Sequence, residues 1–281
     1  MRILYCASEA NPFCGSGGLA DVAGSLPHTL CRKGQDCRIV VPLYGTIPQE
    51  LRNSLNFITN FTEPVAWRHQ YCGLFWARWH DCTYYFIDNE YYFKRGTLYG
   101  HYDDAERFAF FSRAILEMLP YIDFHPDMIH CNDWQTALVP VYYYLTIHNI
   151  QYQGEYGWEV NTECVGIPAN ETKILEMNGK LNMMKGAIET ATRVSTVSPS
   201  YAAEIKDPWF SWGLHDELNL RHYKLCGIKN GIDTESYNPE TDYQIYRNYS
   251  KDDMSGKGEC KRALQERLCL EQRWDVPMVG M

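Results

Sequence analysis

The sequence contains no uninterrupted apolar run long enough to span a bilayer, and no separate signal-peptide pattern stands before its first apolar residues. It also contains no dense cluster of lysine and arginine. Its 35 acidic residues outnumber 26 basic ones, which gives a formal net charge of −9. Nucleic acids and anionic membranes are bound through basic patches that neutralise phosphate, so we expect neither as a partner. These absences predict a cytoplasmic protein.

Several catalytic and metal-binding motifs are absent as well. There is no Gly-x-Ser-x-Gly elbow, no His-Glu-x-x-His pair and no Walker loop. Eleven cysteines occur without a Cys-x-x-Cys pair or a Cys/His zinc spacing, and we expect no metal site. Because several cysteines lie inside apolar, strand-like runs, we expect reduced and mostly buried thiols.

Hydrophobic residues make up 45% of the chain, enough for a substantial core. Strand-like runs recur with helical stretches between them, which predicts an α/β fold with a doubly wound, mostly parallel sheet. The expected strands are Arg2–Cys6, Cys37–Val41, Leu74–Trp79, Thr83–Ile87, Asp127–His130, Leu145–Ile147, Arg193–Thr196 and Leu225–Ile228. The expected helices are Leu19–Lys33, Asp104–Leu119, Trp134–Tyr142, Leu181–Thr190, Pro199–Glu204 and Gly258–Leu268.

Two places look unusual for an uninterrupted domain. The run Tyr142–Ile147 passes from helix to strand without turn residues, so we expect that a connecting loop is missing there. The last residues, 277–281, look like the start of a new strand. We therefore expect one domain over residues 1–276 and the beginning of a second domain at 277. The aromatic segment Arg68–Phe93 alternates and predicts a hairpin or meander inserted after the second strand.

A glycine-rich loop between the first strand and the first helix is the most informative segment. It reads GSGGLADV over Gly15–Val22, and its missing side chains allow backbone N–H groups to approach a ligand. The N-terminus of the helix adds partial positive charge, which makes phosphate a plausible ligand. The pattern also fits the dinucleotide fingerprint G-x-G-x-x-A, but the second strand lacks the acidic residue that would hold a ribose. A tight turn without any ligand is a further alternative.

Polar residues follow two later strands. Asp133 and Trp134 come after the strand that ends at His130, and a carboxylate beside an aromatic ring suits a sugar. The alternative makes Asp133 a helix N-cap and Trp134 a core residue. His148, Asn149 and Gln153 follow the next strand. We expect these carboxyl ends to lie side by side along one cleft.

Taken in order, these motifs resemble the N-terminal domain of bacterial glycogen synthases and plant starch synthases. The matching segments are SEA at Ser8–Ala10, GGLADVAGSLP at Gly17–Pro27, HCNDWQ at His130–Gln135, LTIHNIQYQG at Leu145–Gly154, Leu181–Ile205, GIKNGID and YNPETD. The resemblance spans essentially the whole chain. It implies a Rossmann-like domain of a two-domain GT-B glucosyltransferase.

The resemblance implies transfer of glucose from ADP-glucose to the 4-hydroxyl at the non-reducing end of an α-1,4-glucan, with retention and without cofactor or metal. The donor's phosphate itself would take the acceptor proton. His148 and Asp133 would be catalytic, Gly15, Ser16, Gly17, Gly18, His148 and Asn149 would bind the donor, and Asp21, Asp133, Trp134 and Gln153 would bind the acceptor sugar.

The sequence departs from the family pattern in three ways. Gly15 stands where most relatives have a lysine that reaches the donor phosphates, and Gln135 replaces a common histidine. The family's second, nucleotide-binding domain, an expected partner, is not in this sequence. We therefore expect no synthase activity from these 281 residues alone. A non-catalytic glucan-binding or regulatory homologue is the alternative.

Overall fold

The computed structural model describes residues 1–65, 67–139, 144–168, 171–235 and 237–279. The chain forms two compact units, residues 1–230 and 231–281. The boundary after Asn230 falls inside the expected single domain 1–276. The expected missing loop at Tyr142–Ile147 falls partly on residues 140–143, which lie outside the described residues.

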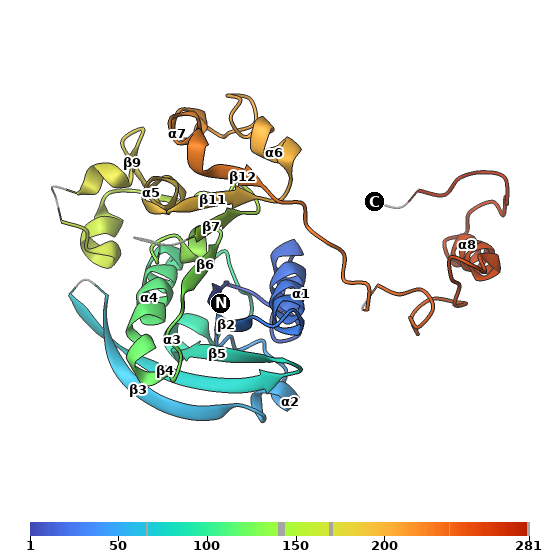
Figure 1. The fold of residues 1–281 in the computed structure, drawn as a ribbon, viewed down its shortest axis with the longest axis horizontal. Coiled ribbons are helices and arrows are strands. Elements are labelled where there is room, and N and C mark those ends of the chain that lie inside the picture. Colours follow the sequence, from blue (N-terminus) through green and yellow to red (C-terminus); the bar gives the residue numbers. More distant parts are fainter. Residues whose placement is uncertain (66, 140–143, 169–170, 236, 280–281) are drawn as a thin grey trace. The chain divides into compact units, whose positions relative to one another are not determined.

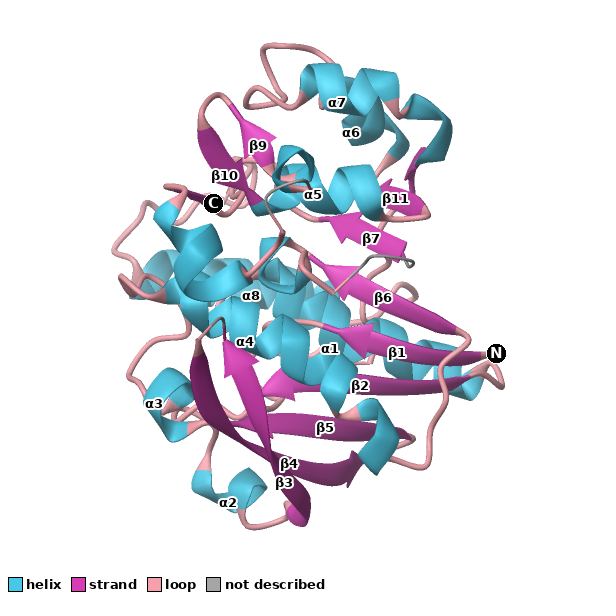
Figure 2. Cartoon of the chain, turned by 90° about the vertical axis from the view of Figure 1, so that its left-hand side faces the viewer, coloured by secondary structure: helices cyan, strands magenta, loops and turns pink. Residues whose placement is uncertain are grey.

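A nine-stranded sheet forms the centre of the first unit (Figure 2). Its strand order is β12-β11-β7-β6-β1-β2-β5-β4-β3. The first seven strands of that order are parallel to their neighbours, which confirms the predicted doubly wound, mostly parallel sheet. These strands are β12 (Leu225–Gly227), β11 (Arg193–Thr196), β7 (Tyr144–Ile147), β6 (Met128–Asn132), β1 (Arg2–Cys6), β2 (Asp36–Pro42) and β5 (Cys82–Asp88).

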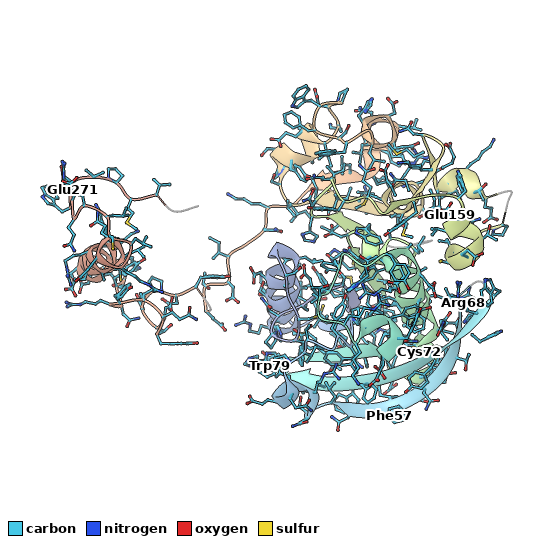
Figure 3. All side chains as sticks on the ribbon, turned by 180° about the vertical axis from the view of Figure 1, so that it is seen from behind. Phe57, Arg68, Cys72, Trp79, Glu159 and Glu271 are labelled. Carbon is cyan, nitrogen blue, oxygen red and sulfur yellow. The ribbon has the colours of Figure 1, made fainter. Side chains whose placement is uncertain are left out.

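The aromatic segment forms part of this sheet. Strand β4 (Arg68–Trp79) is antiparallel to both β5 and β3 (Asn56–Val65). Figure 3 labels Arg68, Cys72 and Trp79 along β4, and Phe57 on β3. The predicted hairpin is confirmed, but β5 also pairs in parallel with β2. The sequence did not predict β3, because only Glu63 and Val65 of this edge strand are buried and it carries no apolar run.

Helices cover both faces of the sheet, as Figure 1 shows for α1 (Gly18–Arg32) and α4 (Asp104–Glu117). Parallel strands buried on both sides are apolar throughout, and β1 is buried at every residue after Arg2. The other helices of this unit are α2 (Gln49–Arg52), α3 (Glu90–Phe93), α5 (Met183–Thr190), α6 (Pro199–Glu204) and α7 (His215–Leu220). A small second sheet contains β8 (Glu155–Tyr156), β10 (Lys180–Asn182) and β9 (Glu176–Met177).

Two helix predictions need correction. The expected helix over Trp134–Tyr142 is wrong in its described part, where only the 3-10 turn η2 (Trp134–Thr136) forms. Pro140 disfavours helical backbone at the residue before it, which shortens any helix here. The expected helix Leu181–Thr190 begins two residues late, at Met183, because Leu181 and Asn182 belong to β10. The Asn182 side chain caps it by accepting from the N–H of Lys185 at 2.8 Å.

The second unit, residues 231–281, contains the helix α8 (Ser255–Arg267), close to the predicted Gly258–Leu268. Within this unit the side-chain amide of Asn248 donates to the carbonyls of Pro239 and Asp242 at 3.0 and 2.8 Å. Most of its apolar side chains are exposed. None of the helices in the described parts of the chain is long and apolar enough to cross a membrane.

Candidate functional site

The parallel register brings the predicted polar clusters to one edge of the sheet. Cys6 pairs with Cys131, and Asn132 pairs with Thr146, so the last residues of β1, β6 and β7 lie side by side. The loops that follow these strands carry the glycine-rich segment, Asp133 and His148. The expectation of a shared carboxyl edge is therefore confirmed for these three strands.

Glu9 organises the glycine-rich loop. Its Oε2 accepts from the backbone N–H of Ser16 at 2.5 Å and from the Ser16 hydroxyl at 2.8 Å, and its carboxylate also accepts from the N–H of Gly17. Burial raises the pKa of Glu9, these hydrogen bonds lower it, and the nearby Asp133 charge raises it again. Two of the amides that the sequence offered to phosphate are thus bound to an internal carboxylate. Sequence reasoning missed Glu9, although Ser8–Ala10 was part of the matched pattern.

The position of the family lysine is closed in this chain. A Cβ atom at Gly15 would stand 2.7 Å from the Ala20 Cβ and 2.8 Å from the Asn11 Oδ1. Asn11 also donates through its side-chain nitrogen to Asp21 Oδ1 at 2.8 Å, so its carboxamide is held in place. Any side chain at Gly15 requires movement of Asn11 or of the first turn of α1. Asp21, a predicted acceptor residue, is exposed and bound to Asn11.

Open space lies beside the next two glycines. A Cβ at Gly18 would meet nothing within 4 Å, and one at Gly17 would meet only Glu9 Oε1, at 4.0 Å. Helix α1 begins at Gly18 and has no side-chain cap at Gly17. A helix N-terminus without a cap leaves backbone N–H groups for an outside partner. Because Glu9 already holds the N–H of Gly17, Gly18 is the predicted donor residue whose backbone a ligand can approach most directly.

Asp133 holds the neighbouring loop. Its Oδ1 accepts from the backbone N–H of His148 at 2.9 Å, and its carboxylate also accepts from the N–H of Asn149. Its backbone has φ 57° and ψ −177°, a region that residues other than glycine rarely adopt. Asp133 precedes η2 but makes no side-chain cap bond to it, so the helix-cap alternative is not what the structure contains. Burial raises the pKa of Asp133, while His148 and the two amides lower it.

The imidazole of His148 is fixed by Asn132. Its Nε2 lies 3.1 Å from Asn132 Oδ1, which also accepts from the Tyr5 hydroxyl at 3.0 Å. The Asn132 side-chain nitrogen donates to the carbonyl of Cys6 at 2.9 Å, which fixes the orientation of the amide. Because Oδ1 can only accept, Nε2 of His148 carries the hydrogen, and Nδ1 is the acceptor of the neutral ring. Asn149, in turn, uses its Oδ1 to accept from the N–H of Gln151 at 2.9 Å.

A second histidine lies behind His148. The Nε2 of His130 is 2.6 Å from the Thr146 hydroxyl, which is 2.8 Å from the Ser195 hydroxyl. Burial, and then the nearby His148, lower the pKa of His130 to about 3. A small cavity of about 70 Å³ is lined by both histidines, Thr146 and Ser195 among others. His130 is therefore a neutral, structural histidine beneath the site.

Two predicted sugar-binding side chains point into the protein. Trp134 is 8% exposed and packs against the rings of Phe108 and Tyr156, at centroid distances of 5.2 and 6.0 Å. The core alternative is therefore the one that the structure contains for Trp134. Gln153 is also buried: its Nε2 donates to the carbonyls of Ile150 and Trp212, and its Oε1 accepts from Asn182 at 2.6 Å. In this conformation the Gln153 carboxamide is bound within the protein, and the Trp134 ring packs against other aromatic rings.

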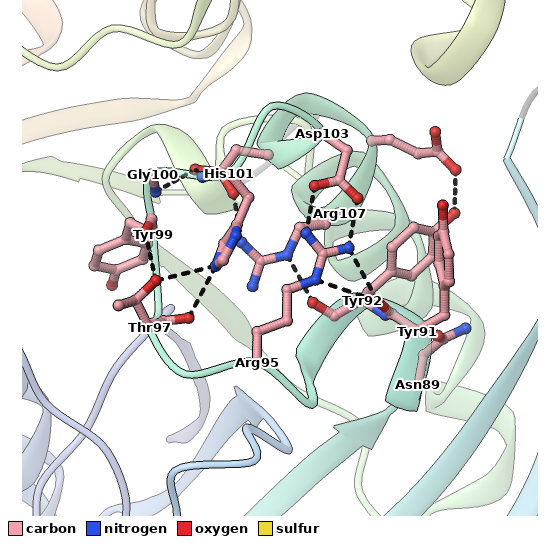
Figure 4. Close-up of polar contacts among 12 residues, drawn as sticks. Asn89, Tyr91, Tyr92, Arg95, Thr97, Tyr99, Gly100, His101, Asp103 and Arg107 are labelled. Atoms are coloured by element: carbon pink, nitrogen blue, oxygen red, sulfur yellow. Dashed lines mark hydrogen bonds and ion pairs between the residues drawn. The ribbon is translucent and has the colours of Figure 1, made fainter.

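Ion pairs and hydrogen bonds hold the loop after α3 in place (Figure 4). Arg95 donates to both carboxylate oxygens of Asp103, at 2.5 and 2.6 Å. The buried Arg107 donates to the carbonyls of Tyr92 and Leu98 and to the carboxylate of Asp104. Tyr99 connects this loop to the segment that follows β1, because its hydroxyl lies 2.8 Å from the hydroxyl of Ser8.

Sequence reasoning missed these contacts, because Arg95 and Asp103 meet only when the loop between them folds. The spacing of Asp104 and Arg107, at i and i+3 in α4, was the one local signal among them. In the described part of the chain, no group of three or more His, Cys, Asp or Glu side chains could hold a metal ion.

Comparisons with known proteins found similar sequences and a similar solved structure. The sequence profile of the starch synthase catalytic domain matches residues 2–220. The chain is 44% identical over 299 aligned residues to a glycogen synthase of Alkaliphilus metalliredigens and 43% identical over 298 residues to one of Lactobacillus acidophilus. Each match covers 100% of this chain and 63% of the relative. The chain thus spans less than two thirds of these relatives.

A solved structure is also similar to this chain. It is the catalytic domain of starch synthase IV from Arabidopsis thaliana, bound to ADP and acarbose. Its TM-score is 0.86 at 33% sequence identity, and the match covers 96% of this chain and 59% of that one.

Proposed function

The chain belongs to the family of the starch synthase catalytic domain, and on that premise we propose that it is the acceptor-side part of an α-1,4-glucan glucosyltransferase. The donor would be ADP-glucose, the acceptor the 4-hydroxyl at the non-reducing end of a glycogen or starch chain, and the anomeric configuration would be retained. We propose a cytoplasmic location and a reaction that needs no metal or cofactor.

The observation that carries the proposal is the convergence of three loops at one sheet edge. The backbone at Gly18 is open to a ligand, and Asp133 fixes the loop of His148. Support comes from the similar starch synthase IV domain, which was solved with ADP and acarbose. A nucleotide and a glucan mimic are the ligands that such an edge would take in this chain.

The roles of the residues follow from their contacts. We propose that His148 faces the donor sugar with Nδ1 as an acceptor, because Nε2 is bound to Asn132. Asp133 acts as a positioning residue: both of its known hydrogen bonds go to backbone N–H groups of the His148 loop. The protein's contribution is then orientation and electrostatic stabilisation of the separating sugar and phosphate.

The glycine loop favours the second candidate, a glucan-binding homologue without transferase activity. Gly15 lacks the lysine of its relatives, and the space for a side chain is filled by Ala20 and Asn11. The negative charge of Glu9 also stands where the amides of Ser16 and Gly17 would otherwise be free for phosphate. Both observations weaken the donor side.

A chimaera separates the two candidates. The chain would be joined to the remaining part of the Alkaliphilus metalliredigens glycogen synthase, and incorporation of labelled glucose from ADP-glucose into glycogen would be measured. The enzyme proposal expects incorporation above that of a matched His148→Ala chimaera. A folded chimaera that binds maltoheptaose but incorporates no label would support the glucan-binding candidate instead. The 281-residue chain alone should incorporate nothing, since it lacks over a third of the length of its relatives.

The missing charge at Gly15 needs a control for size. Gly15→Ala and Gly15→Lys both place a Cβ against Ala20 and Asn11, but only the lysine adds a cation. In the chimaera we expect ADP to bind the lysine variant at least about 10-fold more tightly than the alanine variant, because a charge-assisted contact contributes about 1.5–3 kcal/mol and about 1.4 kcal/mol is tenfold. Equal affinities by calorimetry would show that Gly15 does not face the donor phosphates.

A further inference from the structure

Two thiols far apart in the sequence meet at the end of α1 opposite the glycine loop. Cys31 lies in the last turn of α1, and Cys82 is the first residue of β5. Their Sγ atoms are 3.0 Å apart although 51 positions separate them in the chain. A disulfide bond needs about 2.05 Å between its sulfurs, so a shift of about 1 Å would join them.

Only one of the two thiols is reachable from solvent. Cys31 is partly exposed and lines a surface cavity of about 610 Å³, together with Arg32, Arg38 and Arg78. Cys82 is fully buried and does not line this cavity. A small reagent would therefore meet Cys31 first and Cys82 only through Cys31.

We propose that Cys31 and Cys82 form a dithiol site that a low-molecular-weight disulfide converts into an intramolecular disulfide. Cys31 loses its proton to water, and its thiolate attacks one sulfur of the reagent RS–SR. The S–S bond of the reagent breaks, one RS⁻ leaves and takes up a proton, and a mixed disulfide forms on Cys31. Cys82 then loses its proton, attacks the Cys31 sulfur and releases the second RS⁻. Two protein thiols are oxidised, and one small disulfide is reduced to two thiols.

The surroundings of the pair explain the order of these steps. Burial raises the pKa of Cys82 above its ordinary value, and the neighbouring Cys31 thiol raises it further. The contribution from Cys31 ends once that sulfur is part of a mixed disulfide, so Cys82 becomes easier to ionise at the moment when it must attack.

A second thiol pair in the protein serves as an internal comparison. Cys6 and Cys131 are neighbours on the adjacent strands β1 and β6, and their side chains interact. Both are fully buried, unlike Cys31. Because neither thiol of this pair is accessible, we expect Cys6 and Cys131 to stay reduced while Cys31 and Cys82 oxidise.

The test is peptide mapping of the purified 281-residue chain after incubation with oxidised glutathione. We expect a mass loss of two hydrogens, a cross-linked peptide that joins Cys31 to Cys82, and unmodified Cys6 and Cys131. The oxidised form should unfold at a temperature roughly 5 °C higher, because the new bond closes a long loop, and dithiothreitol should reverse both changes. A stable glutathione adduct on Cys31 without the cross-link would overturn the proposal, and so would unmodified cysteines.

Cys37 provides the matched variant, because the Cys31 thiol donates to its carbonyl at 3.2 Å and its own thiol lies nearby. Cys37→Ser should still form the cross-link, whereas Cys31→Ser and Cys82→Ser should not. A Cys31–Cys37 cross-link in the wild-type chain would contradict the assignment. The wild-type map decides this even where a serine at the buried position 82 prevents folding.

Discussion

At the scale of single residues, the site depends on Asp133, whose backbone conformation is energetically unfavourable for a residue with a side chain. Asp133 keeps a backbone conformation that suits glycine, and it does so where its carboxylate receives the N–H groups of His148 and Asn149. Strain of this kind persists only where surrounding contacts over-determine it. At Asp133 the hydrogen bonds of the carboxylate therefore stabilise the folded protein, whereas the backbone conformation destabilises it.

Two substitutions at Asp133 separate these effects. Asp133→Ala and Asp133→Gly both remove the carboxylate, but only glycine also relieves the backbone. Glycine is usually less stable than alanine, yet here we expect the glycine variant to be more stable by about 1–2 kcal/mol in urea unfolding. Both variants should weaken binding of maltoheptaose alike, since the His148 loop loses its anchor in each. An alanine variant at least as stable as the glycine variant would disprove the strain.

Glu63 is a residue whose ionised form destabilises the folded protein. It is fully buried on β3 and lies 2.8 Å from the Nε of the exposed Arg113. Burial raises the pKa of Glu63 from 4.5 to about 7, although Arg113 opposes the shift. Between pH 4.5 and 7 the folded protein therefore holds a proton that the unfolded chain has lost, so Glu63 reduces stability as the pH rises through this window.

We expect Glu63→Gln to remove this part of the pH dependence. Relative to wild type, the variant should gain about 2 kcal/mol of unfolding free energy between pH 5 and pH 8, measured by urea titration at both values. Taking the difference from wild type cancels the opposite effect of His130, whose lowered pKa costs stability as the pH falls. Glu117→Gln is the control. Glu117 is exposed, and its charge raises the pKa of Glu63 without being the burial that is the main cause of the shift. A difference that does not change with pH would contradict the raised pKa.

At the scale of elements, a glycine permits the packing between the site loop and the core. Gly154 has φ +67°, and a Cβ there would stand 2.7 Å from Cε3 of Trp134. The indole ring can therefore lie directly against the backbone that follows Gln153. The loop after β7 is held against η2 by this contact, as well as by the hydrogen bonds of Asp133.

Gly154→Ala should lower the free energy of unfolding more than an alanine substitution at a comparable glycine with positive φ. Gly179 has φ +78° with nothing within 4 Å of an added Cβ, so Gly179→Ala measures the backbone penalty alone. We expect the Gly154 variant to lose at least 2 kcal/mol more than the Gly179 variant in chemical unfolding, since Trp134 must also move. Equal losses of unfolding free energy in the two variants would mean that the Trp134 ring moves aside without an energetic penalty.

At the scale of the whole molecule, we expect the two compact units to differ in how readily a protease cleaves their backbone. Tyr243 in residues 231–281 and Tyr102 in residues 1–230 are both 91% exposed. Tyr102, however, lies beside Asp103, which Arg95 binds through both carboxylate oxygens. Exposure of the side chain is therefore equal, but Tyr102 has an ion pair beside it, whereas the residue before Tyr243 is held by the neutral hydrogen bond from Asn248.

Limited digestion with chymotrypsin should accordingly cut after Tyr243 well before Tyr102. We expect the first stable product to retain residues 1–243, as measured by intact mass over a time course. The Arg95→Ala variant should accelerate cleavage at Tyr102 without changing the rate at Tyr243. Equal initial rates at both tyrosines in the wild-type chain would contradict the role given to the ion pair of Arg95 and Asp103.

The sequence by itself determined the parallel sheet, most of its strands, the helices α1, α4 and α6, and the edge at which the polar loops meet. These features depend on local periodicity and on the rule that parallel strands end at one edge. Only the tertiary structure decided the role of each side chain at that edge. Glu9 binds the loop amides, Asn132 sets the tautomer of His148, and Trp134 and Gln153 turn inward.

These contacts join residues that are far apart in the chain or turn on backbone angles that no spacing encodes, as at Asp133. The proximity of Cys31 and Cys82 has the same origin, since it arises only when α1 packs beside β5. Periodicity fixes which face of an element is buried, whereas partners across 15 or 51 positions are chosen by packing alone.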